Sequence, residues 1–452
     1  MFRKRDTHIH FVGIGGIGMS GIAEVLANLG YRVTGSDLAT TDTTNRLAGL
    51  GASIYHSHEA QHVDGADVVV TSSAIQSENP EVAEALARKI PVIPRAEMLA
   101  ELMRLKQGVL IAGSHGKTTT TSILATMFHH AGLDPTVVIG GKVNSFDSNA
   151  RLGYGEFLVA EADESDGSFL VLPPTFAVIT NIDDEHLDHY GDLATLLDAF
   201  VGFANRVPFY GATIVCTDDP NVRTILPRSG KRTVTYGLDG TPDYLATAIT
   251  DDGEGSRFEV TARGESMGAF NIQMPGLHNV RNALAAIALC DSMSVHPASV
   301  RAALEQFDGV QRRFTVRASC NGITIVDDYA HHPTEIRATL SGARARFPKG
   351  RIFAIVQPHR YTRVRDSLDR FPESLDAADE VMITDIYAAG EAPIEGIHGQ
   401  LLVEQVRARR PDRPVSLTPS LEAIPASLLP RLQAGDVVVT MGAGSITKLS
   451  HW

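Results

Sequence analysis

Short apolar segments alternate with helical segments along this chain in three successive cycles. The expected strands are His8–Val12, Tyr31–Gly35, Val68–Thr71, Pro91–Ile93, then Val109–Ala112, Phe157–Ala160, Phe176–Thr180, Thr213–Cys216, then Ile323–Val326, Ile352–Val356, Glu380–Ile383 and Val437–Met441. The expected helices between them include Ser20–Leu29, Pro80–Arg88, Thr118–Ala131 and Val280–Asp291. Strands separated by helices of this length predict parallel sheets that helices cover on both faces. We therefore expect an α/β fold.

The three cycles divide the 452 residues into three domains of ordinary size. Boundaries near residues 107 and 313 give domains of residues 1–107, 108–313 and 314–452. One stretch departs from the alternation. From Thr233 to Met274 the chain is rich in Gly, Thr and Asp and has short β-prone runs, which predicts smaller antiparallel strands.

The charge balance excludes some classes of partner. There are 40 Lys and Arg residues against 53 Asp and Glu residues, a net charge of -13, which argues against binding to nucleic acid or to an anionic membrane. Cys216, Cys290 and Cys320 lie far apart, so we expect neither a disulfide framework nor a thiolate metal cluster. No apolar run reaches about 18 residues, so we expect no membrane span and a cytoplasmic protein. We also expect a monomer or a weak homodimer.

A first glycine-rich loop, Gly13-Ile-Gly15-Gly16-Ile-Gly18, lies between the first expected strand and the first expected helix. Asp37 follows Gly18 by 19 residues and ends the next strand. In a dinucleotide site such glycines let the backbone approach a diphosphate, the helix N-terminus stabilises its charge, and the acid binds a ribose hydroxyl. The loop predicts a diphosphate more firmly than it predicts NAD. A purely structural tight turn is the alternative.

A second loop, Gly113-Ser114-His115-Gly116-Lys117-Thr118, follows the Val109–Ala112 strand. It ends as a phosphate loop does, although it is shorter, because Ile111 occupies the place of the first glycine of the longer pattern. Backbone N–H groups can still surround phosphates, while Lys117 reaches the terminal ones and Thr118 can bind Mg²⁺. We interpret this loop as an ATP site.

Acidic clusters end two strands of the second cycle. They are Glu161-Ala-Asp163-Glu164-Ser-Asp166 and Asn181-Ile-Asp183-Asp184-Glu185-His186. Ligands of open α/β sheets gather at the carboxyl ends of strands, so both clusters are expected to meet the second loop. Carboxylates suit Mg²⁺, and one neutral His among them is acceptable. Most of these acids are expected to cap helices instead, but not Glu161 or His186.

Five segments together resemble the Mur ligase family, which forms amide bonds with ATP in peptidoglycan precursor synthesis. They are Gly-Ser-His-Gly-Lys-Thr-Thr-Thr at 113–120, Glu-Ala-Asp-Glu-Ser-Asp at 161–166, Asn-Ile-Asp-Asp-Glu-His at 181–186, Gly-Leu-His-Asn-Val-Arg-Asn-Ala at 276–283 and Asp-Asp-Tyr-Ala-His-His-Pro-Thr-Glu at 327–335. The resemblance covers essentially the whole chain, in the family's order. The opening segment at 10–23 and Gln-Pro-His-Arg-Tyr-Thr-Arg at 357–363 are similar to the member that adds L-alanine.

The resemblance implies a ligase that joins L-alanine to the lactyl carboxylate of UDP-N-acetylmuramate through an acyl phosphate, with ATP and two Mg²⁺ ions. It implies a Rossmann-like first domain for the UDP-sugar and a central phosphate-loop ATPase-type domain for ATP and Mg²⁺. A Rossmann-like third domain would hold the amino acid and part of the adenosine site. On this interpretation the first glycine loop binds a UDP diphosphate, and Asp37 need not contact NAD.

Residue roles follow from the same resemblance. The UDP-sugar would be bound by Gly13, Gly15, Gly16, Gly18, Asp37 and Ser72. ATP would be bound by Gly113, Ser114, His115, Gly116, Lys117, Thr118, Thr119, His278, Asn279, Asn282 and Arg313, with Arg312 as the alternative to Arg313. The metal ligands would be Thr118, Glu161 and His186. The carboxylate and alanine end would be lined by Tyr329, His331, His359, Arg360 and Arg363. The catalytic residues would be Lys117, Glu161, His186, Arg360 and Arg363.

One position departs from the wider family. Several sibling ligases carry a carbamylated Lys about 14 residues after the histidine that matches His186, and here that place is Phe200. We therefore do not expect that modification in this chain. The coordination of the second metal is correspondingly open.

Other functions remain as alternatives. A nicotinamide-dependent oxidoreductase would explain the first loop and Asp37, but not the second loop or Glu161. A regulatory or transport NTPase would explain the second loop alone. A nearer competitor attaches a whole tripeptide to the same UDP-sugar. In the third domain, His331 could face solvent at a helix entry, and Arg360 and Arg363 could belong to a solvated helix face.

Overall fold

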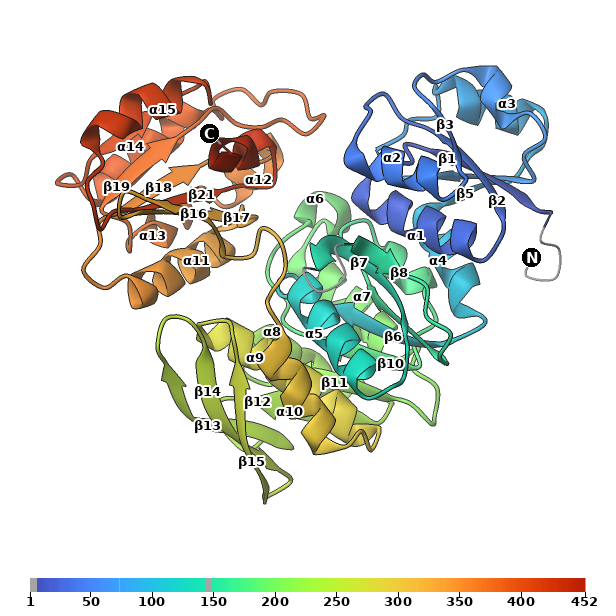
Figure 1. Ribbon diagram of the computed structural model, residues 1–452, viewed down its shortest axis with the longest axis horizontal. Helices are drawn as coiled ribbons and strands as arrows, with labels where there is room; N and C mark the ends of the chain where they lie inside the picture. Colours follow the sequence, from blue (N-terminus) through green and yellow to red (C-terminus); the bar gives the residue numbers. More distant parts are fainter. Residues whose placement is uncertain (1–5, 73, 144–147, 452) are drawn as a thin grey trace. The chain divides into compact units, whose positions relative to one another are not determined.

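The computed structural model describes residues 6–72, 74–143 and 148–451 of the chain. Its described strands form three sheets (Figure 1), and the chain divides into two compact units. One unit comprises residues 1–247, 260–268 and 281–307, and the other comprises residues 248–259, 269–280 and 308–452. Among the described residues, no helix combines the length and the apolar character that a membrane span requires.

The N-terminal sheet is parallel and has the strand order β3-β2-β1-β4-β5. Its elements are β1 (His8–Val12), α1 (Ile17–Asn28), β2 (Arg32–Ser36), α2 (Asp42–Gly49), β3 (Ser53–Tyr55), the 3₁₀ helix η1 (Ala60–Val63), β4 (Val68–Thr71), α3 (Pro80–Ala87), β5 (Val92–Pro94) and α4 (Arg95–Met103). The predicted limits of β1 and β4 are confirmed. Helix α1 begins three residues before the predicted start, because its first turn already lies in the glycine loop.

The central sheet has ten strands in the order β15-β14-β13-β12-β11-β10-β6-β9-β7-β8. Its first half consists of β6 (Gln107–Ala112), α5 (Lys117–His130), β7 (Thr136–Val143), β8 (Ser148–Arg151), β9 (Phe157–Glu161), η3 (Ser168–Val171), β10 (Phe176–Ile179), α6 (Leu187–Tyr190) and α7 (Leu193–Ala204). Its second half consists of β11 (Ala212–Cys216), α8 (Pro220–Ile225), η4 (Leu226–Arg228), β12 (Thr233–Gly237), β13 (Tyr244–Asp251), β14 (Ser256–Ala262), β15 (Glu265–Ile272), α9 (Leu277–Ser292) and α10 (Pro297–Gln306).

The prediction of antiparallel strands from Thr233 onward is wrong for β12 and for the start of β13. Strand β12 pairs in parallel with β11, and Tyr236 of β12 pairs in parallel with Tyr244 of β13. For β12 the cause is the helical segment formed by α8 and η4, which returns the chain to the start of the sheet before β12 begins. Its start has the usual sequence signal, since Asp219 caps the helix and Pro220 opens it.

The C-terminal sheet has the order β16-β17-β21-β18-β19-β20. Its elements are β16 (Thr315–Cys320), β17 (Ile323–Asp328), α11 (Pro333–Arg346), β18 (Ile352–Val356), α12 (Tyr361–Asp366), α13 (Phe371–Ser374), β19 (Glu380–Ile383), α14 (Gly399–Arg409), β20 (Val415–Leu417), α15 (Ala423–Leu428), η5 (Leu429–Arg431), β21 (Val437–Met441) and η6 (Ser445–His451). Only the β16–β17 pair among these is antiparallel. Apolar clusters cover both faces of this sheet, as expected for parallel strands.

Candidate functional site

The second glycine loop joins the end of β6 to the start of α5. Gly113 has φ 129° and Gly116 has φ 83°, and both values lie in the region that favours glycine. A Cβ atom on Gly113 would lie 2.1 Å from Oγ1 of Thr180, so no side chain fits there. Thr118 and Thr119 are buried in the first turn of α5. The loop is therefore held tightly against the carboxyl end of β10, the neighbour of β6.

Lys117 is surrounded by oxygen atoms. Its Nζ donates to the carbonyl oxygens of Gly113 at 2.6 Å and Ser114 at 3.4 Å, and to both carboxylate oxygens of Glu164 at 2.8 Å. Burial would lower the pKa of Lys117, but Glu164 and Asp163 outweigh that effect and raise it. The lysine is thus a cation held in place at the loop. Its partner Glu164 belongs to the acidic cluster at 161–166, most of whose acids were expected to cap helices.

Glu164 is fully buried and lies at the centre of the acidic cluster that follows β9. Burial raises its pKa to about 7, an effect that Lys117 opposes and that Asp163 reinforces. His186 belongs to the same group, since its Nε2 lies 3.8 Å from Glu164 and 3.7 Å from Glu185. The backbone of His186 has φ 60°, a left-handed conformation rare outside glycine and asparagine. The structure therefore brings Lys117 and His186, both predicted site residues, to one carboxylate.

The other predicted acid, Glu161, ends strand β9. Its Oε1 accepts a hydrogen bond from the N–H of Gly140 on β7, at 2.7 Å. Asp163 and Asp166 accept turn N–H groups from Ser165 and Ser168, at 3.1 and 3.0 Å. We expected most of these acids to cap helices, but the N-cap residue of η3 is Gly167, and Asp163 and Asp166 hold turns of the segment after β9.

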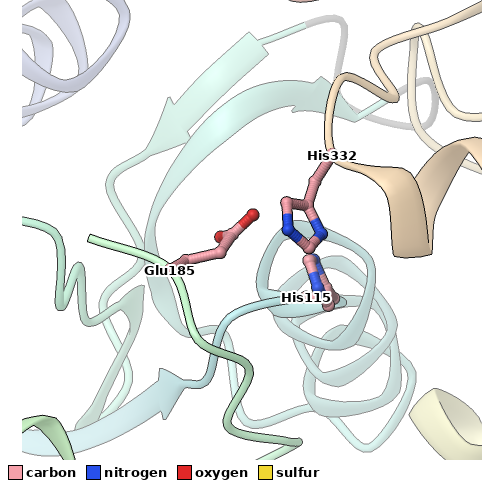
Figure 2. Close-up of side chains that lie close together, drawn as sticks. All are labelled: His115, Glu185 and His332. Atoms are coloured by element: carbon pink, nitrogen blue, oxygen red, sulfur yellow. The ribbon is translucent and has the colours of Figure 1, made fainter. Parts of the chain in front are cut away.

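His115 and Glu185 lie near each other on the segments that follow β6 and β10 (Figure 2). A nitrogen of His115 and a carboxylate oxygen of Glu185 are within 4.8 Å. His115 also contacts Asp183, with Nε2 and Oδ2 3.1 Å apart, while its N–H donates to Asn181 at 2.9 Å. The third side chain labelled in Figure 2, His332, belongs to the other unit, where it is the N-cap residue of α11.

Helix α9 contributes one predicted nucleotide residue directly to the loop. Oδ1 of Asn282 accepts from Oγ1 of Thr120 at 3.2 Å, and a Cβ on Gly116 would lie 2.5 Å from the same Oδ1. Asn279 donates to the carbonyl of Pro275 at 2.8 Å, and the His278 ring lies against Gly276. Asn282 therefore lies beside the phosphate loop, through its contacts with Thr120 and Gly116.

The first glycine loop is fixed mainly by the end of β2. The N–H groups of Gly13 and Ile14 donate to the carbonyl of Ser36 at 2.8 and 3.0 Å, and the N–H of Gly15 donates to Oδ2 of Asp37 at 2.9 Å. Asp37 therefore holds the loop itself, rather than standing free for a ribose as the glycine pattern predicts.

Two more predicted positions lie near this loop or on the same sheet. The absence of a side chain at Gly18 leaves room for Arg95, because a Cβ there would lie 2.6 Å from Nη1 of Arg95. Ser72 follows β4, is half-buried, and accepts from the N–H of Ile75 through its carbonyl at 3.0 Å. Arg95 is a cation that the sequence analysis did not single out.

In the C-terminal domain, aromatic and imidazole rings meet beyond the ends of β17 and β18, which pair with opposite edges of β21. The ring centroids of Tyr329 and His331, after β17, are 5.3 Å apart, and those of His331 and His359, after β18, are 5.6 Å apart. Tyr387, which the sequence analysis missed, stacks on His359 at 5.5 Å. Four rings therefore form a continuous row.

Arginines surround this row of rings. Nη1 of Arg363 donates to Nδ1 of His359 at 3.2 Å, and Arg312 and Arg313 lie 5.0 and 5.3 Å from the Tyr329 ring centroid. Burial, followed by the charges of His331 and the neighbouring arginines, lowers the pKa of His359 to about 3. His359 is therefore neutral and can accept the Arg363 hydrogen bond. Arg360 has φ 68° and donates its N–H to the carbonyl of Tyr387 at 2.9 Å.

Phe200 is a core residue. It is fully buried in α7, and its ring meets that of Phe169 at 5.3 Å. A phenyl ring in this packed position has no metal-binding group, so this position offers no ligand in place of the carbamylated Lys of the sibling ligases.

Family models match the chain in three consecutive segments. Residues 8–107 match the Mur ligase family, catalytic domain, residues 111–290 match the Mur ligase middle domain, and residues 312–444 match the Mur ligase, glutamate ligase domain. The chain belongs to the Mur ligase family. The second glycine loop and its two acidic clusters fall within the second matched segment, and the ring row falls within the third.

Relatives of this Mur ligase are similar over its full length. The UDP-N-acetylmuramate--L-alanine ligase of Anaeromyxobacter dehalogenans is 57% identical over 447 residues, which is 99% of this chain and 97% of the relative. The solved UDP-N-acetylmuramate-alanine ligase of Thermotoga maritima is 30% identical with a TM-score of 0.84, covering 98% and 97% of the two chains. A murein peptide ligase of Psychrobacter arcticus is 26% identical with a TM-score of 0.74, covering 98% and 97%.

Proposed function

We propose that this Mur ligase joins L-alanine to the lactyl carboxylate of UDP-N-acetylmuramate, converting ATP to ADP and phosphate, in peptidoglycan precursor synthesis. The observation that carries the proposal is the 57% identity, over nearly the whole chain, to a relative named for that reaction. The alignment covers 97% of the relative, so each of its domains has a counterpart in this chain. Residues 1–107 would hold the UDP-sugar, residues 108–313 ATP, and residues 314–452 the amino acid.

The chemistry requires activation of a carboxylate. A carboxylate is a poor acyl donor, because its carbon is electron-rich and its leaving group is poor. Transfer of the ATP γ-phosphoryl group to it gives an acyl phosphate, the alanine amine attacks the carbonyl carbon, and phosphate leaves from the tetrahedral intermediate. Most of the catalytic effect then comes from positioning and from charge stabilisation.

Lys117 would supply part of that charge stabilisation. Its ammonium group is already fixed at the loop by Glu164 and two carbonyl oxygens. On ATP binding it would exchange the Glu164 carboxylate for the β- and γ-phosphates, while Gly113–Thr119 surround them. Asn282, which contacts the loop at Gly116, would lie near the nucleotide together with His278 and Asn279.

The donor set of the acidic cluster fits Mg²⁺. Glu161 supplies a carboxylate and Thr118 a hydroxyl, which are ligands that Mg²⁺ prefers, and His186 would serve a second ion beside Glu164 and Glu185. Bound Mg²⁺ would offset negative charge on the transferring phosphoryl group. The chain's own part is to hold these oxygen and nitrogen atoms close to Lys117.

The row of rings and arginines in the C-terminal domain would receive the amino acid. Arg360 and Arg363 would orient carboxylates, for which the guanidinium fork is suited. Tyr329, His331 and His359 would form the wall beside the small side chain. Because His359 is neutral, it would add no charge next to the incoming ammonium group.

Omission of single substrates tests this function. Phosphate release should require ATP, Mg²⁺, UDP-N-acetylmuramate and L-alanine together, and the product should have the mass of the alanyl conjugate. Phosphate release from ATP alone would favour an NTPase instead. A change in absorbance at 340 nm with NAD(P)H would favour an oxidoreductase.

A further inference from the structure

The start of helix α9 is held by a carboxylate that has no part in the function proposed above. The N–H of Gly276, the residue before α9, donates to Oδ2 of Asp251 at 2.7 Å. Asp251 is the last residue of β13, and its other oxygen, Oδ1, accepts the N–H of Gly253 at 2.8 Å. One side chain therefore joins the turn between β13 and β14 (Figure 1) to the beginning of α9.

Gly276 sets the position of a residue to which an ATP role is assigned. Its carbonyl accepts the N–H groups of Asn279 and Val280, at 2.9 and 3.2 Å, so the first hydrogen bonds of α9 start from it. Gly276 has φ 101°, and a Cβ atom there would lie 2.7 Å from Cε1 of His278. The imidazole ring of His278 thus packs directly on the Gly276 backbone. A shift of Gly276 would move this ring and the first turn of α9 together.

The turn that follows Asp251 is supported on another side by helix α11. A Cβ atom on Gly253 would lie 2.7 Å from Cα of Arg346, the last residue of that helix, so the two backbones are in close contact. Nη2 of Arg346 also lies 3.6 Å from Oε1 of Glu254. Asp251 therefore reaches Gly276 from a supported turn rather than from a free loop.

The chemistry of this contact suits a positioning role. The N–H groups at the start of a helix have no partner within the helix, and a carboxylate is a strong acceptor for them. Its negative charge is also favourable beside a helix N-terminus. Asp251 is exposed, so its hydrogen bonds, and not apolar packing, are what its side chain contributes. Removal of this side chain would release Gly276 and leave the apolar core intact.

We propose that Asp251 is a positioning residue for ATP, which holds Gly276 and thereby places His278 and Asn279 for the nucleotide. The inference rests on the proposed function, because it takes ATP as the ligand of the segment that opens α9. In this role Asp251 contacts the backbone of the chain and not the nucleotide. It therefore affects the affinity for ATP and not the rate of phosphoryl transfer, for which Lys117 remains in place.

Two alanine variants of the full chain test the inference. Asp251→Ala removes the acceptor of the Gly276 N–H. Asp252→Ala is the matched control, because Asp252 is also exposed and accepts two N–H groups, those of Glu254 and Gly255 at 2.9 and 2.8 Å, but both lie within the turn. Calorimetric titration with a non-hydrolysable ATP analogue and Mg²⁺ should give a Kd about tenfold higher for Asp251→Ala and no change for Asp252→Ala. The parent affinity in Asp251→Ala would overturn the inference.

Further measurements separate positioning from a general loss of stability. In Asp251→Ala the KM for ATP should rise about tenfold, whereas kcat and the KM for UDP-N-acetylmuramate should not change. Without nucleotide, the amides of residues 276–280 should exchange hydrogen faster in Asp251→Ala than in Asp252→Ala, while the two thermal midpoints stay close. An equal rise of the KM for ATP in both variants would overturn the inference, because the turn as a whole would then be responsible. No binding of the analogue by the parent chain would instead contradict the proposed function.

Discussion

The ammonium group of Lys117 donates to four oxygen atoms, two of them from Glu164. The two residues lie far apart in sequence, and both side chains are largely inaccessible to solvent, so loss of one leaves the other in the interior without its partner. The pair therefore has two consequences. It keeps the lysine at the phosphate loop before ATP arrives, and it makes the stability of the central domain depend on both residues.

Lys117→Ala should lower turnover by on the order of 10³ or more, since it removes the cation at the phosphates. It should also lower the free energy of unfolding by about 3 kcal/mol, because Glu164 remains buried alone. Adding Glu164→Gln should recover much of that stability but none of the activity. Phosphate release and urea unfolding measure the two effects.

Lys106→Ala is the matched control, because it removes a lysine that hydrogen-bonds only to backbone carbonyls away from the phosphate loop. Its Nζ donates to the carbonyls of Gly153 and Gly155, at 2.8 and 2.6 Å, away from the phosphate loop. We expect this variant to be less stable and still active. Full activity in Lys117→Ala would show that the loop does not bind ATP in the way proposed.

Glu81 makes a different prediction, about pH. Burial would raise its pKa, but His10, Ser36, His58 and His62 outweigh burial and lower it from 4.5 to about 2. A carboxylate with a lowered pKa stabilises the folded chain fully above pH 4.5, and this contribution is lost as the pH falls towards 2. The parent chain should thus exceed Glu81→Gln in stability at pH 7, and the difference should shrink below pH 4.5.

Urea unfolding of both chains between pH 7 and pH 3 provides the measurement. Comparing the pair cancels most contributions from the other titrating groups. A difference that stays constant across this range would mean that the Glu81 carboxylate does not gain its stabilisation from being ionised.

At the scale of elements, the turn between β6 and α5 is the one most restricted by packing. Gly113→Ala should abolish ATP-dependent turnover, because its Cβ would overlap Oγ1 of Thr180 at 2.1 Å and displace the loop. Gly132→Ala is the control, since Gly132 also has positive φ, 73°, but has nothing within 4 Å of the added atom. That control should lose about 1 kcal/mol of stability and keep its turnover. Equal activity of the two variants would contradict the packing argument.

Elements with short apolar runs between polar residues were predictable from the sequence. The limits of β18, β19 and β21 agree with the predicted ones for this reason. Strand β12 was not, because its parallel pairing depends on a short helical return, α8 with η4, inside a stretch rich in turn-forming residues. The sequence pattern in such a stretch does not determine which strand β12 pairs with, or whether the pairing is parallel.

Within the candidate sites, the sequence predicted which residues lie near one another only where they belong to one loop or follow neighbouring strands. Glycine positions and the strand ends placed Lys117 and the acids at one edge, but Glu164 is 47 residues from Lys117 and one of several similar acids. The sequence did not predict the roles of Tyr387 or of the buried carboxylate Glu81, because their partners come from different strand ends and helices. Their side chains meet only after the sheets have formed.

At the scale of the whole molecule, each of the three sheets has its candidate binding residues at the carboxyl ends of its parallel strands. The N-terminal sheet has a glycine loop held by Asp37, the central sheet has Lys117 and the acids, and the C-terminal sheet has the rings and arginines. The net charge of -13 accords with this division, because some of the carboxylates would hold Mg²⁺. The anionic substrates would meet backbone N–H groups and a few placed cations.

The central claim is the identity of the acceptor, and a competition in a single reaction tests it most directly. The chain is incubated with ATP, Mg²⁺, UDP-N-acetylmuramate and equal amounts of L-alanine and the tripeptide that murein peptide ligases attach. Mass spectrometry then reads the product. We predict the mass of UDP-N-acetylmuramoyl-L-alanine as the main product. The tripeptide conjugate as the sole product would contradict the assignment.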